Sequence, residues 1–163
     1  MHKEWLTLNN FSVAGLSART CNQNEMTLSK AKIGILMADY WHNNLSATLG
    51  ARLNPGTTYA VYTDYASDEH GDYTYLLGEH VTSQEPQALT SFSTTVIPAG
   101  RYVKFTTEAG PMPQIVINAW HAIWQMTPSD LAGTRSYQAD FEVYDKRALD
   151  PAHAIVDIYI GLA

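Results

Sequence analysis

The sequence lacks the residues on which several classes of protein depend. It has one cysteine, Cys21, in 163 residues, which excludes an internal disulfide and every zinc site built from several cysteines. It also lacks an apolar run of about 18 residues and a basic segment followed by an apolar one, which mark a membrane helix and a secretory signal. We therefore expect a cytoplasmic protein that does not associate with membranes.

Basic residues are scarce as well. Ten Lys and Arg face sixteen Asp and Glu, for a net charge of −6, whereas nucleic-acid backbones are bound by basic surfaces. The six histidines form no pair at metal-ligand spacing with a carboxylate, and neither a nucleophile elbow nor a phosphate-binding glycine loop occurs. The sequence thus predicts no direct binding of nucleic acid, no metal, no cofactor and no catalytic residue.

What the sequence has in excess is aromatic residues with a polar group. It contains ten Tyr and four Trp but only four Phe. Tyr and Trp combine an electron-rich face with a hydrogen-bonding atom, which suits a polar pocket better than a dry core. A chain of this length also buries a core without disulfides or metals.

The segment Tyr137–Tyr144 reads as a strand that carries a carboxylate among aromatic neighbours. Alternation places Gln138, Asp140, Glu142 and Tyr144 on one face and Tyr137, Ala139, Phe141 and Val143 on the other. Because Phe141 and Val143 require a core, Glu142 between them is drawn into an apolar setting, where a carboxylate is costly unless it is paired or protonated. From these residues alone three readings stay open: Glu142 attracts a cationic ligand, lies on a solvated face, or pairs with Arg101 or Arg135.

The remaining elements follow from hydrophobic spacing and turn signals. One helix is expected to begin near Thr27 or Ser29 and to end before Asn54, and another to follow Gly110–Pro113 and end by Pro128. The stretch 83–93 is expected to connect the two halves of the chain. The expected strands cover residues 11–20, 57–65, 73–81, 96–107, 136–145 and 154–162.

The second half of this pattern repeats the first. Ala14-Gly15 aligns with Ala99-Gly100, Trp41 with Trp124, and 59–62 with 141–144, at offsets of 85, 83 and 82. We expect an α+β fold of two β-α-β-β units, 11–81 and 96–162, that superpose about a pseudo-twofold axis. The units would share an antiparallel sheet, two helices and a central groove in a single domain, 1–163. Glu142 then has Ala60 as its counterpart, so a charge faces a small residue across the axis.

Several segments resemble the GyrI-like family, the effector-binding domains of bacterial activators such as Rob and BmrR. They are 59–65, 71–78, 97–102, the helix segment Trp120–Trp124 and the strand Asp140–Tyr144. The likeness covers nearly the whole chain and is greatest to stand-alone members, including those on integron gene cassettes. It implies a tandem-repeat fold whose groove binds lipophilic cations through a Glu on the penultimate strand, which is Glu142 in this sequence.

Repeat and resemblance together predict the function. We expect a module that captures amphipathic aromatic cations and performs no chemistry on them. Two alternatives stay open: a hydrolase of electrophilic genotoxins with Glu142 as the base, and a modulator of a protein partner that the sequence does not identify. Exposed strand edges in such folds are also compatible with a homodimer. The predicted ligand-binding residues are Glu142, Trp120, Tyr62, Tyr144, Trp124 and Tyr40.

Overall fold

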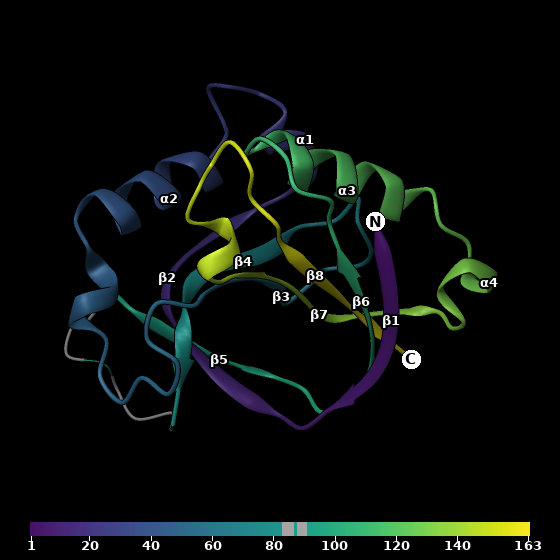
Figure 1. Ribbon diagram of the computed structural model, residues 1–163, viewed down its shortest axis with the longest axis horizontal. Helices are drawn as coiled ribbons and strands as arrows, with labels where there is room; N and C mark the ends of the chain where they lie inside the picture. The colour runs from purple at the N-terminus through teal and green to yellow at the C-terminus, as the bar shows by residue number, and fades with distance from the viewer. Residues whose placement is uncertain (83–86, 88–90) are drawn as a thin grey trace.

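The computed structural model describes residues 1–82, 87 and 91–163. This part of the chain forms a curved antiparallel sheet with helices over one face (Figure 1). The strands are β1 (His2–Leu8), β2 (Phe11–Thr20), β3 (Thr58–Thr63), β4 (Tyr73–Val81), β5 (Ser93–Ile97), β6 (Gly100–Thr106), β7 (Arg135–Tyr144) and β8 (Asp157–Leu162). The helices are α1 (Asn22–Glu25), α2 (Ile33–His42), α3 (Gln114–Trp124) and α4 (Pro128–Leu131), with 3-10 turns η1 (Leu45–Thr48) and η2 (Lys146–Ala148).

The strand order places β3 and β7 at the centre of the sheet. The order is β1-β6-β8-β7-β3-β4-β2-β5, and every neighbouring pair is antiparallel. Ala60 on β3 lies opposite Glu142 on β7 in this central pair. The edge strands come from distant parts of the chain, because β1 pairs with β6 and β5 pairs with β2.

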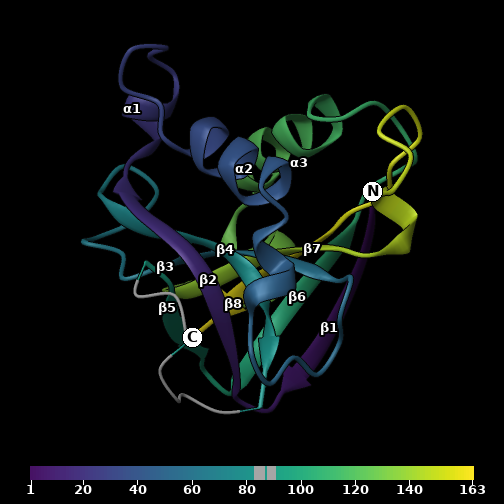
Figure 2. The ribbon, with the colours of Figure 1, turned by 90° about the vertical axis from the view of Figure 1, so that its left-hand side faces the viewer.

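Alternation along the two central strands divides their side chains between two cores. Ala60 and Tyr144 belong to the core beneath the helices, whereas Val61 and Phe141 belong to the core on the opposite face. Both main helices, α2 and α3, lie over the same face of the sheet (Figures 1 and 2). The face that carries Tyr144 is therefore the one enclosed by helices. None of the helices in the described ranges is long and apolar enough to span a membrane.

Most strand boundaries agree with the sequence, with three differences. The strand β1 was not predicted; its polar residues hide the alternation that sends Leu6 and Leu8 into the core. The predicted strand 96–107 is two strands, β5 and β6, because Pro98 and Ala99 separate them. The predicted connection 83–93 ends in β5, and its residues 83–86 and 88–90 lie outside the described part.

The first main helix, α2, begins later than Thr27 or Ser29, because its N-terminus is capped by Glu25, a residue of the preceding short helix α1. The carboxylate of Glu25 accepts hydrogen bonds from the backbone N–H groups of Lys32 (3.0 Å) and Ile33 (3.1 Å). A carboxylate at this position satisfies free N–H groups and interacts favourably with the helix dipole. The prediction that this helix begins near Thr27 or Ser29 was wrong, since α2 begins at Ile33.

The predicted alternation of β7 fails at one residue. Tyr137 has a φ of 50°, and the pairing of β7 with β8 shifts between Arg135 and Asp140. This irregularity turns Tyr137 away from the face of Phe141. Its ring instead contacts Tyr65, with centroids 5.6 Å apart.

The close approach of strands β2 and β4 depends on a glycine at position 78. Gly78 pairs directly with Gly15, and a Cβ atom at Gly78 would collide with the carbonyl group of Ala14. We expect Gly78→Ala to lower the free energy of unfolding by about 2 kcal/mol or more, since backbone atoms must move to accept the methyl group. Urea unfolding followed by circular dichroism measures this change.

Gly34 on α2 provides the matched control, because a Cβ atom there meets nothing within 4 Å. We expect Gly34→Ala to raise the free energy of unfolding by up to about 1 kcal/mol, the difference in helix propensity. Equal effects of the two substitutions would contradict the close approach of β2 and β4.

Candidate functional site

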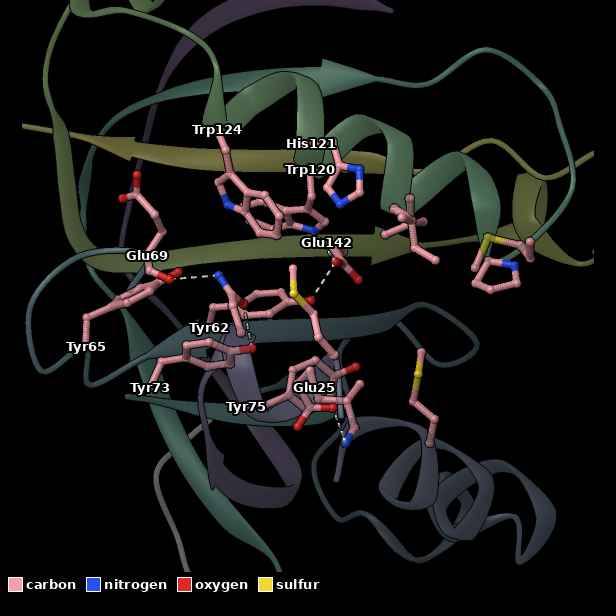
Figure 3. Close-up of a pocket in the computed structure, with 18 of the residues that line it drawn as sticks. Glu25, Tyr62, Tyr65, Glu69, Tyr73, Tyr75, Trp120, His121, Trp124 and Glu142 are labelled. Carbon is pink, nitrogen blue, oxygen red and sulfur yellow. Dashed lines mark hydrogen bonds between the residues drawn. The ribbon is translucent and has the colours of Figure 1, made fainter. Parts of the chain in front are cut away.

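A pocket of about 340 Å³ lies between the helices and the helix-covered face of the sheet. Figure 3 shows α3 on one side of it and the aromatic residues of the sheet on the other. Its lining is mainly aromatic and apolar, with three carboxylates and one guanidinium group. The lining residues are Asn22, Glu25, Met26, Ile33, Met37, Tyr62, Tyr65, Glu69, Tyr73, Tyr75, Met112, Pro113, Val116, Ile117, Trp120, His121, Trp124, Arg135, Glu142 and Tyr144.

The carboxylate of Glu142 lies at the floor of the pocket and receives three hydrogen bonds. Its Oε1 accepts from the hydroxyl of Tyr62 (2.8 Å) and from Nε1 of Trp120 (2.6 Å). Its Oε2 accepts from the hydroxyl of Tyr144 (2.5 Å). Only 1% of Glu142 is exposed. The donors come from β3, α3 and β7, so the carboxylate links the helix to the centre of the sheet.

Burial dominates the electrostatics of this group. It raises the pKa of Glu142 above the ordinary value for a glutamate, although the hydrogen bonds from Tyr144, Trp120 and Tyr62 act to lower it. Burial and the neighbouring carboxylate also raise the pKa of Tyr62 and of Tyr144 well above 10. The tyrosines therefore remain protonated and donate hydrogen bonds to Glu142.

No cationic side chain in the described ranges forms a salt bridge with Glu142. Arg135 pairs with Asp140 through Nη2 at 2.7 Å, and Arg101 donates to the carbonyl oxygen of Ala132. Two of the three readings left open by the sequence are thereby removed, namely a solvated Glu142 and a Glu142 paired with arginine. The carboxylate is buried, stabilised by neutral donors and without a counter-ion among these residues.

The structure brings together five of the six predicted residues, since Glu142, Trp120, Trp124, Tyr62 and Tyr144 all line the pocket. The rings of Tyr62 and Trp120 meet edge to face at 5.1 Å, and those of Trp120 and Trp124 lie 6.2 Å apart.

Tyr40 is placed differently. It is 1% exposed and does not line the pocket. Its hydroxyl has no partner among the described residues. Helical spacing placed Tyr40 on the apolar side of α2, and that side faces the core at this residue.

Sequence reasoning did not select several other lining residues. Tyr73 and Tyr75 alternate along β4, and Tyr75 pairs directly with Tyr62, so strand periodicity combined with that register would have found them. Met37 lies four residues after Ile33, which also lines the pocket, so the helical spacing of α2 indicates its face. Met112 follows no such signal, because it lies in a loop before α3 whose packing the sequence does not specify. In the described ranges no group of three or more His, Cys, Asp and Glu could hold a metal.

This fold, a sheet of this order with two helices over one face, is also found in other solved structures. Solved structures with this fold include SAV2435 bound to tetraphenylphosphonium, at a TM-score of 0.75 and 13% identity, covering 100% of this chain and 94% of that one. The C-terminal domain of EcmrR shares it at a TM-score of 0.59 and 14% identity, covering 99% and 97%. These identities establish a common fold only.

The chain belongs to the Cass2 family of integron-associated effector binding proteins, which matches residues 6–162. An integron cassette protein of Vibrio cholerae, VCH_CASS2, is 31% identical with a TM-score of 0.77, over 99% of this chain and 95% of that one. The "Putative transcriptional regulator protein YobU" of Bacillus subtilis (strain 168) is 34% identical over 151 residues, covering 91% of this chain and 90% of YobU. The resemblance inferred from the sequence is confirmed.

The raised pKa of Glu142 predicts how stability depends on pH. Because protonation is easier in the folded state, this group favours folding most below the ordinary glutamate pKa of about 4.3 and loses that contribution as pH rises through its folded pKa. We expect the free energy of unfolding of Glu142→Gln to increase relative to wild type between pH 4 and pH 8. Urea titrations of both proteins at each pH measure the difference, and a difference independent of pH would contradict the raised pKa.

Proposed function

We propose that this protein is a stand-alone binding module that captures lipophilic aromatic cations and leaves them chemically unchanged. The observation that carries this proposal is the carboxylate of Glu142, 1% exposed at a pocket floor and without a cationic partner among the described residues. Removing an ion from water costs several kcal/mol, and neutral donors offset only part of that cost. A bound cation would supply the remaining compensation.

The aromatic walls favour cations whose charge is delocalised or shielded. Two of the three donors to Glu142 are tyrosine hydroxyls and the third is an indole N–H. The same rings present π faces, each of which contributes about 0.5 to 2 kcal/mol to binding a cation. At an effective dielectric constant of 20, a cation 4 Å from the carboxylate gains about 4 kcal/mol. A ligand without N–H groups uses both effects and leaves no donor unsatisfied in the pocket.

The relatives support the same class of ligand. SAV2435, which has this fold, binds tetraphenylphosphonium, a permanent aromatic cation with no hydrogen-bond donor. Such a ligand matches a pocket in which Glu142 already accepts three hydrogen bonds.

We also propose that the domain is a tandem duplication with the pocket at its pseudo-twofold axis. The order β3-β4-β2 in one half corresponds to β7-β8-β6 in the other, and Ala60 lies opposite Glu142 where the axis would pass. The strand that precedes β2 and the one that precedes β6, namely β1 and β5, each pair with the other half of the sheet, which supports an inseparable domain of residues 1–163.

The charge of Glu142 predicts a selective effect. We expect Glu142→Gln to weaken binding of tetraphenylphosphonium by about 30-fold or more, because truncating one partner of a desolvated charge pair costs about 2 to 5 kcal/mol. Tetraphenylmethane derivatives made water-soluble with neutral groups have a similar shape and should bind both proteins equally. Fluorescence quenching at fixed pH and salt measures all four dissociation constants. An equal loss for both ligands would show that the carboxylate is structural.

Substitution of Trp120 should affect both kinds of ligand. We expect Trp120→Ala to weaken cationic and neutral ligands together, since it removes buried area and a π face as well as one donor to Glu142. The same titrations measure this, with urea unfolding to verify that the variant is folded. A loss confined to the cation would place the role of Trp120 in electrostatics alone.

The absence of chemistry is tested separately. We expect tetraphenylphosphonium and an electrophilic aromatic cation to be recovered unchanged after long incubation with excess protein, as measured by mass spectrometry. Glu142→Gln is the control for any reaction that depends on the carboxylate. A hydrolysed product that forms with wild type and not with the variant would replace this proposal with the hydrolase alternative.

A further inference from the structure

The pocket contains a second carboxylate that the function above does not use. Glu69 follows β3 in the chain and lines the pocket beside Tyr65. In Figure 3 it lies at the left, beyond Trp124, whereas Glu142 lies nearer the middle. We propose that Glu69 forms a second anionic subsite, so that the pocket prefers elongated dications with one charged group at Glu142 and the other at Glu69. This inference rests on the proposed function and extends it to a ligand class.

The charged groups around Arg135 do not balance, because one guanidinium group faces the carboxylates of Asp140 and Glu69. The guanidinium group binds Asp140 through Nη2 at 2.7 Å and reaches Glu69 only at 3.8 Å, through Nη1. Asp140 is 0% exposed and receives the shorter contact. Two carboxylates thus share one guanidinium group, so the three groups together carry one excess negative charge.

The carboxylate of Glu69 is also accessible to a ligand. Its side chain is 25% exposed, and its Oε2 accepts a hydrogen bond from the hydroxyl of Tyr137. Its Oε1 accepts no hydrogen bond from the described residues. Although burial acts to raise the pKa of Glu69, the hydrogen bond from Tyr137 and the charge of Arg135 lower it overall. Glu69 is therefore ionised at neutral pH.

The third carboxylate of the pocket, Glu25, does not qualify as a subsite. Its two oxygens accept hydrogen bonds from the backbone N–H groups of Lys32 and Ile33 and from the hydroxyl of Thr20. These bonds hold the N-terminus of α2 and use the acceptor capacity of Glu25. Glu25 therefore stabilises the fold, whereas the carboxylate of Glu69 is available to a ligand.

The surroundings of Glu69 suit a quaternary ammonium group. The ring of Tyr65 lies 5.8 Å from that of Tyr73, and aromatic faces attract such cations. The ring of Tyr137 already carries the guanidinium group of Arg135, 4.4 Å from its centroid, so Tyr65 and Tyr73 are the rings offered to a ligand.

A matched pair of ligands isolates the second charge. Both carry an N-alkylated quinolinium ring on an alkyl chain, which ends in a trimethylammonium group in one and in the isosteric, neutral tert-butyl group in the other. Chains of increasing length locate the spacing that reaches Glu69. We expect the dication to bind wild type about fivefold or more tightly than its monocationic partner at the best length, and expect this ratio to fall as salt is added.

Three variants separate the contributions of the carboxylates. Glu69→Gln should bring the ratio close to one and leave the affinity for the monocation unchanged. Glu142→Gln should weaken both ligands. Glu108→Gln removes an equal charge at a side chain that is 86% exposed and lies outside the pocket, and it should preserve the ratio.

The outcomes distinguish the two proposals. If wild type binds the monocation but the ratio is one at every chain length, or if Glu69→Gln keeps the wild-type ratio, the second subsite is wrong and the proposed function stands. If wild type binds neither ligand, the proposed function itself fails. A ratio that falls equally in Glu69→Gln and Glu108→Gln would show a general effect of net charge and would also overturn the subsite.

Discussion

The architecture around the pocket depends on one buried carboxylate whose hydrogen-bond donors are all neutral. Glu142 is 1% exposed, and its donors are Tyr62, Trp120 and Tyr144. A buried carboxylate destabilises the fold unless these bonds are made, so helix α3 must hold its indole N–H over the central strands. The polar bond therefore fixes the helix position that creates the pocket. The small side chain of Ala60, directly opposite Glu142, leaves the space in which the rings meet.

Comparison with the other buried acids shows what distinguishes Glu142. Asp140 on the same strand binds Arg135, accepts from the hydroxyl of Tyr65 at 2.8 Å and accepts from the backbone of Gly161. Glu79, also 1% exposed, binds Arg52 at 3.0 Å. Asp157, also buried, binds Arg147 at 2.6 Å. These three acids have a guanidinium partner, as buried charges in proteins generally do. In the described part of the chain Glu142 has none, and it is the one of the four that lines the pocket. Its neighbours solvate the charge without neutralising it, which is the property a cation receptor needs.

The sequence predicted the parts of this structure that follow from short-range periodicity. Strands β2 and β4 have the predicted bounds, 11–20 and 73–81, because turn residues flank them. Glu142 and Tyr62 stand out on predicted strands, and Trp120 on the apolar side of a predicted helix. What the sequence missed depends on contacts that periodicity does not encode. The start of α2 is fixed by Glu25, and β1 becomes a strand only by pairing with β6. Tyr40 was misplaced for the same reason, since helical spacing gives a face of α2 but not which part of that face reaches the pocket.

The hydrogen bonds of Glu142 also bear on whether the pocket binds or reacts. A carboxylate has about four acceptor positions, and both positions of Oε1 are taken by Tyr62 and Trp120, while Tyr144 takes one of Oε2. A general base needs a free lone pair within reach of the proton it removes, and the donors also lower the basicity that burial raises. Attraction of a cation acts through space and needs no free lone pair. The three bonds leave Glu142 one acceptor position, on Oε2, for a proton but keep its charge in place, which agrees better with the proposed capture of a cation than with hydrolysis.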